Sequence, residues 1–190
     1  IVESELDEVK YNWNGTNFTL FNDSLVLMYN FDNVSSLGEN STQVVDLSGN
    51  GNNGTWIGEQ DEDSGVNTSD CKFGSCRMFD GEDYVNTNFE PNYQSGDKFT
   101  VSMWIYAIVL QRGEVQDRFY GGFVENGTDD PSILLQFDDT SCSDGEILFF
   151  VRDDDYNSSD SICSSVAGTG FWAHIVAVYN DTDNKNMTIY

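Results

Sequence analysis

Strict alternation of two residue classes in two long segments constrains the fold of this chain more than any other feature. In "KFTVSMWIYAIV" (98–109) and in "FWAHIVAVY" (171–179), the odd-numbered and the even-numbered residues form two groups that a strand would place on opposite faces. Because successive side chains of a strand point to opposite faces, each segment predicts a strand in a two-layer sandwich. Phe99, Val101, Met103, Ile105 and Ala107 would share one face of the first segment, opposite Thr100, Ser102, Trp104 and Tyr106. In the second segment, Trp172, His174, Val176 and Val178 would lie opposite Ala173, Ile175, Ala177 and Tyr179.

Short apolar stretches bounded by Gly, Asn, Asp and Ser continue this pattern along most of the chain. Almost none has a sustained helical period, so the expected fold class is all-β, a two-sheet antiparallel β-sandwich. The predicted strands are 25–31, 53–57, 76–80, 83–87, 98–108, 118–124, 132–137, 146–152, 171–179 and 186–190. A length of 190 residues suits one core. We expect residues 1–22 to form a leader or edge segment and residues 23–190 to form the sandwich.

Two weaker signals occupy the start of the chain. "IVESELDEVK" (1–10) carries Val2, Leu6 and Val9 at helical spacing, which predicts a short helix. "YNWNGTNFTLFNDS" (11–24) alternates aromatic and polar residues around an Asn-Gly pair, which predicts a small hairpin. At the other end, the sequence stops at "NMTIY" inside a predicted strand, so we expect a neighbouring strand or a further domain beyond it.

Charge excludes several classes of partner. The chain has 33 acidic and 8 basic residues and a formal net charge of -25. Such a surface repels phosphate backbones and anionic lipid headgroups, so nucleic acid is not an expected partner. The acidity suits a solubility device, adaptation to salty surroundings, or carboxylates gathered for cations such as calcium. The longest apolar runs, 25–29 and 104–110, are far shorter than the ~20 residues of a membrane helix, so no membrane insertion is expected.

Four cysteines, Cys71, Cys76, Cys142 and Cys163, allow three disulfide pairings. Neither a C-x-x-C motif nor a neighbouring histidine indicates a zinc site. Disulfides are the favoured interpretation, with free buried thiols as the alternative. We expect the local scheme, Cys71 with Cys76 and Cys142 with Cys163, because the second pair flanks an apolar segment and its acidic turn.

Asn-x-Ser/Thr sequons occur eleven times, far more often than random placement gives. Turns also favour Asn, Ser, Thr and Gly together, which explains part of the surplus without any glycan. Sequons, cysteines and acidity together favour an extracellular or cell-surface glycoprotein with N-linked glycans. The predicted glycosylation sites are Asn14, Asn17, Asn22, Asn33, Asn40, Asn53, Asn67, Asn126, Asn157, Asn180 and Asn186.

Three stretches resemble the laminin G-like, or concanavalin A-like lectin/glucanase, jelly roll of bacterial and archaeal surface proteins. They are "LVLMYNFDN…VVDLSGNGNNGT", "KFGSCRMFDGEDYVNT…FTVSMWIYA" and "FWAHIVAVYND…MTIY". The resemblance covers about residues 23–190. The stretch 11–33 also resembles the entry into such modules in large archaeal surface polypeptides, so an archaeal surface protein is the expected source. The resemblance implies a lectin-type jelly roll whose last strands, with an acidic motif, are missing here. His174 resembles a core histidine of the family.

The glycine-rich stretch "VVDLSGNGNNGT" (44–55) first predicts a tight turn, because its Asn-Gly pairs tolerate positive φ. In similar domains the corresponding loop often holds calcium, which nominates Asp46 and Asn50 as metal ligands. Calcium takes six to eight oxygens, so further ligands would have to come from elsewhere.

The resemblance implies a non-catalytic extracellular module of a cell-surface glycoprotein that binds glycans or mediates adhesion, with carbohydrate or a surface protein as its partner. Laminarinase-type hydrolases share the fold but carry an E-x-D-x-E strand, which this sequence lacks. Trp13, Trp56, Trp104 and Trp172 would stack on sugars if exposed, although sandwich aromatics are more often buried. The alternative is a structural subunit or decoration of a glycosylated filament or coat, joined to copies of itself or to another chain by strand addition.

Overall fold

The structure is a computed structural model. It describes residues 8–13, 15–22, 24–61, 64–80, 83–87, 89, 97–107, 118–121, 133–137, 141–143, 145–152, 159–165, 169–181 and 186–190. The chain divides into two compact units, the first formed by Ile1–Met78 with Tyr84–Asn88 and the second by Phe79–Asp83 with Phe89–Tyr190. The single domain expected over 23–190 therefore stays a prediction.

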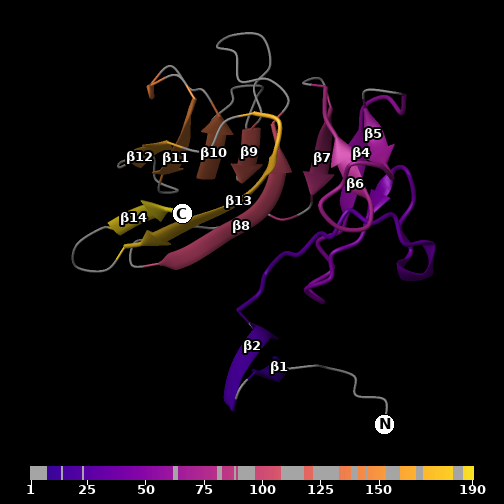
Figure 1. Ribbon diagram of the computed structural model, residues 1–190, viewed down its shortest axis with the longest axis horizontal. Helices are drawn as coiled ribbons and strands as arrows, with labels where there is room; N and C mark the ends of the chain where they lie inside the picture. The colour runs from indigo at the N-terminus through magenta and orange to yellow at the C-terminus, as the bar shows by residue number, and fades with distance from the viewer. Residues whose placement is uncertain are drawn as a thin grey trace. The chain divides into compact units, whose positions relative to one another are not determined.

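The described part of the first unit consists of short strands and one 3-10 turn (Figure 1). They form a β1-β2 hairpin, a three-stranded sheet in the order β3-β4-β7, and a β5-β6 pair. The elements are β1 (Glu8–Trp13), β2 (Thr16–Asn22), η1 (Ser35–Leu37), β3 (Gln43–Val44), β4 (Gly54–Ile57), β5 (Gly65–Asn67), β6 (Cys76–Met78) and β7 (Tyr84–Thr87).

Two antiparallel sheets make up the described part of the second unit (Figure 1). One sheet has the order β12-β11-β10-β9 and the other the order β14-β13-β8. The strands are β8 (Lys98–Tyr106), β9 (Arg118–Gly121), β10 (Ile133–Phe137), β11 (Glu146–Arg152), β12 (Ser159–Ser165), β13 (Trp172–Asn180) and β14 (Asn186–Ile189). The predicted all-β fold class is thus confirmed, and no helix in the described ranges has the length and apolarity needed to cross a bilayer.

A single apolar core joins the two sheets of the second unit, as in a β-sandwich. Ile133, Ile147, Phe149, Ile175 and Tyr179 are among its buried members. Partly buried side chains of β8, β12 and β14 pack against this cluster. Across the two sheets, the ring of Phe99 meets that of Phe149 edge-on at 6.1 Å between centroids. The core of this unit therefore lies between β8-β13-β14 and the four-stranded sheet.

The alternation that predicted β8 and β13 is confirmed. The two strands pair antiparallel along nine positions, from Trp172 opposite Tyr106 to Asn180 opposite Lys98. Ile175, Ala177 and Tyr179 are buried, and Phe99, Val101, Met103 and Ile105, which share a face of β8, are partly buried against them. The other face of each strand points away from the core.

The N-terminal predictions have opposite outcomes. The hairpin is confirmed, because β1 and β2 pair antiparallel on either side of a turn that contains Gly15. The helix is wrong for residues 8–10, which belong to β1, and residues 1–7 lie outside the described part. Cross-strand pairing satisfies the backbone of this segment, whereas an isolated helix of one or two turns is marginal in water.

Residues 25–31 contain no strand, contrary to prediction. Exposure still alternates along Leu25–Met28, as the pattern predicted. Its backbone groups, however, bind the 46–52 loop and not a neighbouring strand. The Nδ2 atoms of Asn50 and Asn52 donate to the carbonyl oxygens of Leu25 and Val26. Side chains thus replace the expected ladder of a partner strand.

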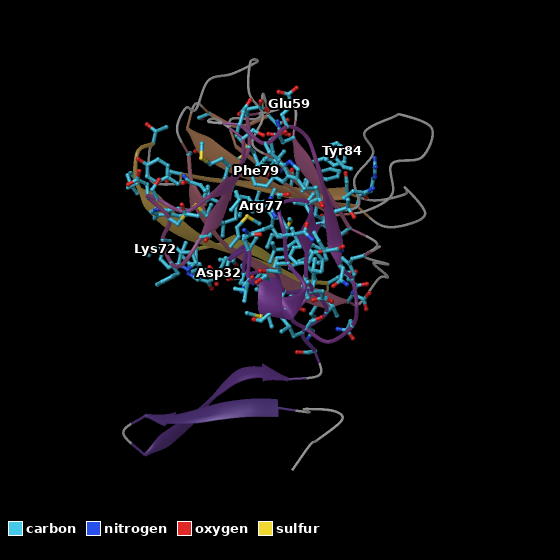
Figure 2. All side chains as sticks on the ribbon, turned by 90° about the vertical axis from the view of Figure 1, so that its right-hand side faces the viewer. Asp32, Glu59, Lys72, Arg77, Phe79 and Tyr84 are labelled. Atoms are coloured by element: carbon cyan, nitrogen blue, oxygen red, sulfur yellow. A yellow bond between two sulfur atoms is a disulfide. The ribbon has the colours of Figure 1, made fainter. Side chains whose placement is uncertain are left out.

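Trp56 anchors the interior of the first unit. Its side chain is 3% exposed, and the guanidinium of Arg77 lies over its ring at 5.2 Å. Arg77, labelled in Figure 2, also donates to the carbonyl oxygens of Ser41 and Asn40 at 2.7 and 2.8 Å. Next to Trp56, a Cβ on Gly54 would lie 2.4 Å from Cγ1 of Val85, so only glycine fits there. Arg77 therefore links β6 to the segment that precedes β3.

Both predicted disulfides are present, Cys71–Cys76 and Cys142–Cys163. The second bond joins the turn before β11 to β12, a strand that the sequence pattern did not predict. Disulfides persist in oxidising compartments, so the two bonds fit a secreted or extracellular domain.

Candidate functional site

The outer face of the sheet β14-β13-β8, which points away from the sandwich core, forms five rows of paired side chains. The rows follow from the strand register and from the backbone pairing of Tyr190 with Val176. From one end to the other they are Lys98, Asn180 and Asn186; Thr100, Val178 and Thr188; Ser102, Val176 and Tyr190; Trp104 and His174; Tyr106 and Trp172. We call the last two rows the aromatic end.

Within the aromatic end, Trp104 and His174 form a stacked pair. Their ring centroids are 4.8 Å apart and the planes differ by 21°. Nε2 of His174 lies 2.9 Å from Oγ of Ser102, so a hydrogen bond fixes the imidazole ring from the neighbouring row. The packing holds the indole in one orientation, while 41% of Trp104 stays exposed.

Tyr106 and Trp172 complete the aromatic end. Their rings meet edge-on with centroids 5.7 Å apart, and Tyr106 is 44% exposed. Four aromatic rings on two adjacent strands are therefore held by each other above a rigid sheet. Aromatic side chains of this kind offer an apolar surface and, in Tyr and Trp, a polar tip, which suits a ligand with apolar faces and hydroxyl edges.

The outer face carries no carboxylate among its described residues, although the chain has 33 Asp and Glu residues. Its charged side chain is the ammonium of Lys98 at one end. The remaining positions carry hydroxyl, amide, aromatic or β-branched side chains. In a molecule of net charge -25, the described residues of this face thus contribute no acidic side chain.

The structure sorts the tryptophans and the histidine that the sequence singled out. Trp56 is buried, Trp104 and Trp172 lie on the outer face, and the side chain of Trp13 is outside the described part. His174 is exposed, so the core position expected from the resemblance is wrong. The alternation of β13 had already grouped His174 with Trp172, and the cross-strand partner Trp104 explains why a polar ring sits there. Tyr106, unlike Trp104, was not singled out because only the strand register shows its pairing.

Asp46 and Asn50, the predicted metal ligands, lie in one loop, where protein donors already surround the carboxylate. Oδ1 of Asp46 accepts hydrogen bonds from the backbone N–H groups of Met28 and Ser48 at 3.0 and 2.9 Å. Oδ2 accepts from the Ser48 hydroxyl at 2.8 Å and from the Asn52 N–H at 3.0 Å. The amide of Asn50 donates to the carbonyl of Leu25 at 2.9 Å. These bonds organise the loop by themselves, and calcium binding here stays a prediction.

The charge of Asp46 is stabilised at this position. Burial alone would raise the pKa of its carboxyl group, but hydrogen bonds from Ser48, Met28 and Asn52 hold that pKa below its ordinary value. Burial, followed by the negative charge of Asp46, raises the pKa of Tyr29 to about 12. The Tyr29 hydroxyl therefore keeps its proton, which it donates to the carbonyl oxygen of Asn52. Asp46 and Tyr29 thus hold the loop from two sides.

Two further features have simpler explanations. Cys142, Glu146 and Cys163 form a cluster with metal-ligand spacing, but the two cysteines are joined in a disulfide and Glu146 accepts a hydrogen bond from the Ser143 N–H.

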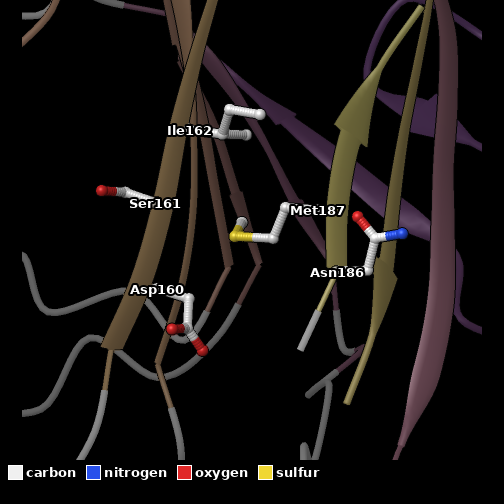
Figure 3. A pocket seen from close by; sticks show the side chains of 5 residues that line it. All are labelled: Asp160, Ser161, Ile162, Asn186 and Met187. Carbon is white, nitrogen blue, oxygen red and sulfur yellow. The ribbon is translucent and has the colours of Figure 1, made fainter. Parts of the chain in front are cut away.

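A groove of about 300 Å³ runs between β12 and β14. In Figure 3, Met187 and Ile162 point toward each other across it, whereas Asn186 points to the other side of β14.

The predicted glycosylation sites fall in several settings. Asn14, Asn126 and Asn157 lie outside the described residues, and Asn17 and Asn22 lie in β2. Asn33, Asn40 and Asn53 are exposed in loops, Asn67 ends β5, and Asn180 and Asn186 face outward from β13 and β14. In Asn40 and Asn67, Oδ1 accepts from the N–H and hydroxyl of the third sequon residue, which leaves Nδ2 directed elsewhere. Occupancy at all eleven sites stays a prediction.

Comparison with known proteins adds one finding. A family model described as the concanavalin A-like lectin/glucanases superfamily matches residues 79–190, which is more than half of the chain and includes the whole outer face. No curated protein and no solved structure matches the chain. The stretches around 25–33 and 44–55, which also contributed to the resemblance, lie outside the matched residues.

Proposed function

This chain belongs to the concanavalin A-like lectin/glucanase superfamily, and from that premise we propose that it is a non-catalytic glycan-binding module of an extracellular, cell-surface glycoprotein. We assign the binding surface to the outer face of β14-β13-β8. The observation that carries the proposal is the aromatic end, a fixed set of exposed rings on a face without carboxylates.

Sugar chemistry matches what the outer face offers. The C–H faces of a pyranose ring are apolar and can stack on Trp104 or Tyr106, as aromatic rings do with other apolar surfaces. Its hydroxyl groups can bond to Ser102, Thr100 and the polar tips of the aromatic residues. Because these groups sit on a rigid sheet, little conformational entropy is lost when a ligand binds.

The same surface is unsuited to hydrolysis. Glycosidases place two carboxyl groups on either side of the scissile bond, one as acid and one as base or nucleophile. Among the described residues the outer face provides none. A sugar held there would be bound but not cleaved, which supports a binding module over the hydrolase reading.

A glycan array, probed with and without calcium, tests the proposal. We expect selective binding to neutral glycans, reduced about tenfold in Trp104→Ala, because the lost stacking is worth about 1.5 kcal/mol. Phe73→Ala is the matched control, since Phe73 is 67% exposed but lies in the first unit. Equal binding by Trp104→Ala and the unaltered protein would place the site elsewhere, and a chain that binds no glycan would refute the proposal.

One observation favours a second candidate function, a structural subunit completed by strand addition. Within the described ranges, β12 and β14 are the outermost strands on one side of their sheets, and the groove between them is lined by Ile162 and Met187. Unpaired strand edges can accept another strand. Light scattering over a range of concentrations distinguishes the two functions, because assembly without glycan binding would support the subunit and a glycan-binding monomer would not.

A further inference from the structure

Two sequons meet face to face on the outer face of the second unit. Asn180 of β13 and Asn186 of β14 are direct partners in the strand register, and both project from the side opposite to the core. Thr188, the third residue of the Asn186 sequon, lies on the same face opposite Val178. Partners in such a pair are about 5 Å apart, so two sugar chains would start from almost the same point.

Steric and exposure differences separate the two asparagines. Asn180 is half-buried on the central strand, between Lys98 and Asn186. Asn186 is exposed on β14, which lies at one side of the described sheet. A sugar ring is wider than the strand spacing of about 4.8 Å, so the exposed Asn186 accommodates a sugar more readily than the half-buried Asn180, which has Lys98 and Asn186 on its two sides.

The surface next to Asn186 leads to the aromatic end. Asn180 and His174 are six residues apart on β13, or about 20 Å along the strand, within the span of a branched N-glycan. The intervening rows carry Val178 and Val176, hydroxyl groups and Tyr190, and no carboxylate. A glycan on Asn186 therefore has a continuous apolar and hydroxyl-bearing path to Trp104.

We propose that Asn186, and not Asn180, carries the N-glycan of this pair, and that its sugar lies along the outer face over the stacked Trp104–His174 rings. The glycan then regulates the proposed binding surface by competing with an external ligand for it. This second effect rests on the proposed function, whereas the site of attachment and the position of the sugar do not.

The test uses the full chain secreted from N-glycosylating eukaryotic cells. Glycopeptide mass spectrometry should find sugar on Asn186 and none on Asn180. The variant Asn180→Gln should keep the glycan, the double variant Asn180→Gln with Asn186→Gln should lose it, and Thr188→Ser should keep the sequon and the sugar. Sugar on Asn180, on both asparagines or on neither would overturn the assignment.

The position of the Asn186 glycan relative to Trp104 is measured by acrylamide quenching of tryptophan fluorescence. Quenching should increase when the Asn186 glycan is absent, and the increase should vanish in a Trp104→Phe background. Unchanged quenching would refute the path of the sugar along the outer face, even with Asn186 occupied.

Regulation is read from the affinity for laminarin, a soluble neutral glucan. Loss of the Asn186 glycan should raise the affinity by about threefold or more, because a larger fraction of molecules has an open aromatic end. If quenching changes but neither form binds laminarin or any arrayed glycan, the proposed function fails while the assignment of the sugar stands. If both forms bind equally, the regulatory effect is refuted and the proposed function stands.

Discussion

At the scale of single residues, Asp46 organises a loop of the first unit by accepting hydrogen bonds from residues on several sides of it. Its two oxygens gather the N–H groups of Met28, Ser48 and Asn52 and the hydroxyl of Ser48. Four donors around one buried carboxylate fix the turn after β3 and attach it to residues 25–28. Hydrogen bonds to a charged group are stronger than neutral ones, so this one side chain accounts for much of the local order.

Replacing Asp46 by Asn should lower the free energy of unfolding of the first unit by about 2 kcal/mol at pH 7, because an amide presents a donor to groups that are themselves donors. The pKa of Asp46 is lowered from 3.8 in the folded state. Its contribution is therefore complete at neutral pH and is lost as the pH falls through the folded-state value, below 3.8. The measurement is chemical denaturation from pH 7 to pH 2.

The control for this prediction is Glu59→Gln, which removes an exposed carboxylate from the same unit. It should leave the stability at pH 7 nearly unchanged. The difference between Asp46→Asn and the unaltered protein should shrink in acid, since protonated Asp46 resembles the amide. A difference that grows toward low pH, or one matched by Glu59→Gln, would contradict the role assigned to Asp46.

Sequence reasoning identified several residues of the outer face but not their surroundings. The alternation of β8 and β13 grouped Trp104 with Tyr106 and Trp172 with His174 before any contact was known. It could not show that the two groups stack across the strands, because register depends on pairing between segments about 70 residues apart. The burial of Trp56 was equally hidden, since the cation above its ring comes from Arg77, on a different strand.

At the scale of elements, strands with a continuous apolar face were predictable from the sequence. A mostly polar strand was not, and neither was an apolar segment that finds no partner strand. β8 and β13 direct alternate side chains toward the core, and β11 buries the apolar run Ile147–Phe149 together with Val151, so the patterns of all three are strong. The sequence of β12, "SDSICSS", is mostly polar, and only Ile162 among its residues packs against the core. Its position comes from the ladder with β11 and from the Cys142–Cys163 bond. Leu25–Met28 is the opposite case, because its sequence pattern predicted a strand but it has no partner strand in the structure.

The two disulfides should therefore stabilise different strands, and by different amounts. On the chain-entropy model, the loop of separation 21 closed by Cys142–Cys163 is worth about 3 kcal/mol, and the loop of separation 5 closed by Cys71–Cys76 about 2 kcal/mol. Cys142→Ser with Cys163→Ser should speed hydrogen exchange in β11 and β12, while Cys71→Ser with Cys76→Ser should act on β5 and β6. Equal effects of both double variants on β12 would show that its ladder suffices without the bond.

At the scale of the whole molecule, a net charge of -25 acts against the local charges of the outer face. Lys98 would attract an anionic ligand at short range, whereas the 33 acidic residues repel it at long range. Salt changes the balance, because the screening length falls from about 30 Å at 0.01 M to about 3 Å at 1 M. Long-range repulsion is removed first, so ionic strength separates the two contributions.

Neutral and anionic glycans should consequently respond differently to salt. Affinity for laminarin should change little between 0.01 M and 1 M sodium chloride, since stacking and hydroxyl contacts involve no net charge, and Trp104→Ala should weaken it at both ends of the range. Heparin should bind weakly at low salt and no more tightly than laminarin at high salt. Titration calorimetry of both ligands is the measurement. Heparin binding that is tight at low salt and lost at high salt would mean that the local charge of Lys98 outweighs the charge of the whole chain, and the ligand class would then be anionic.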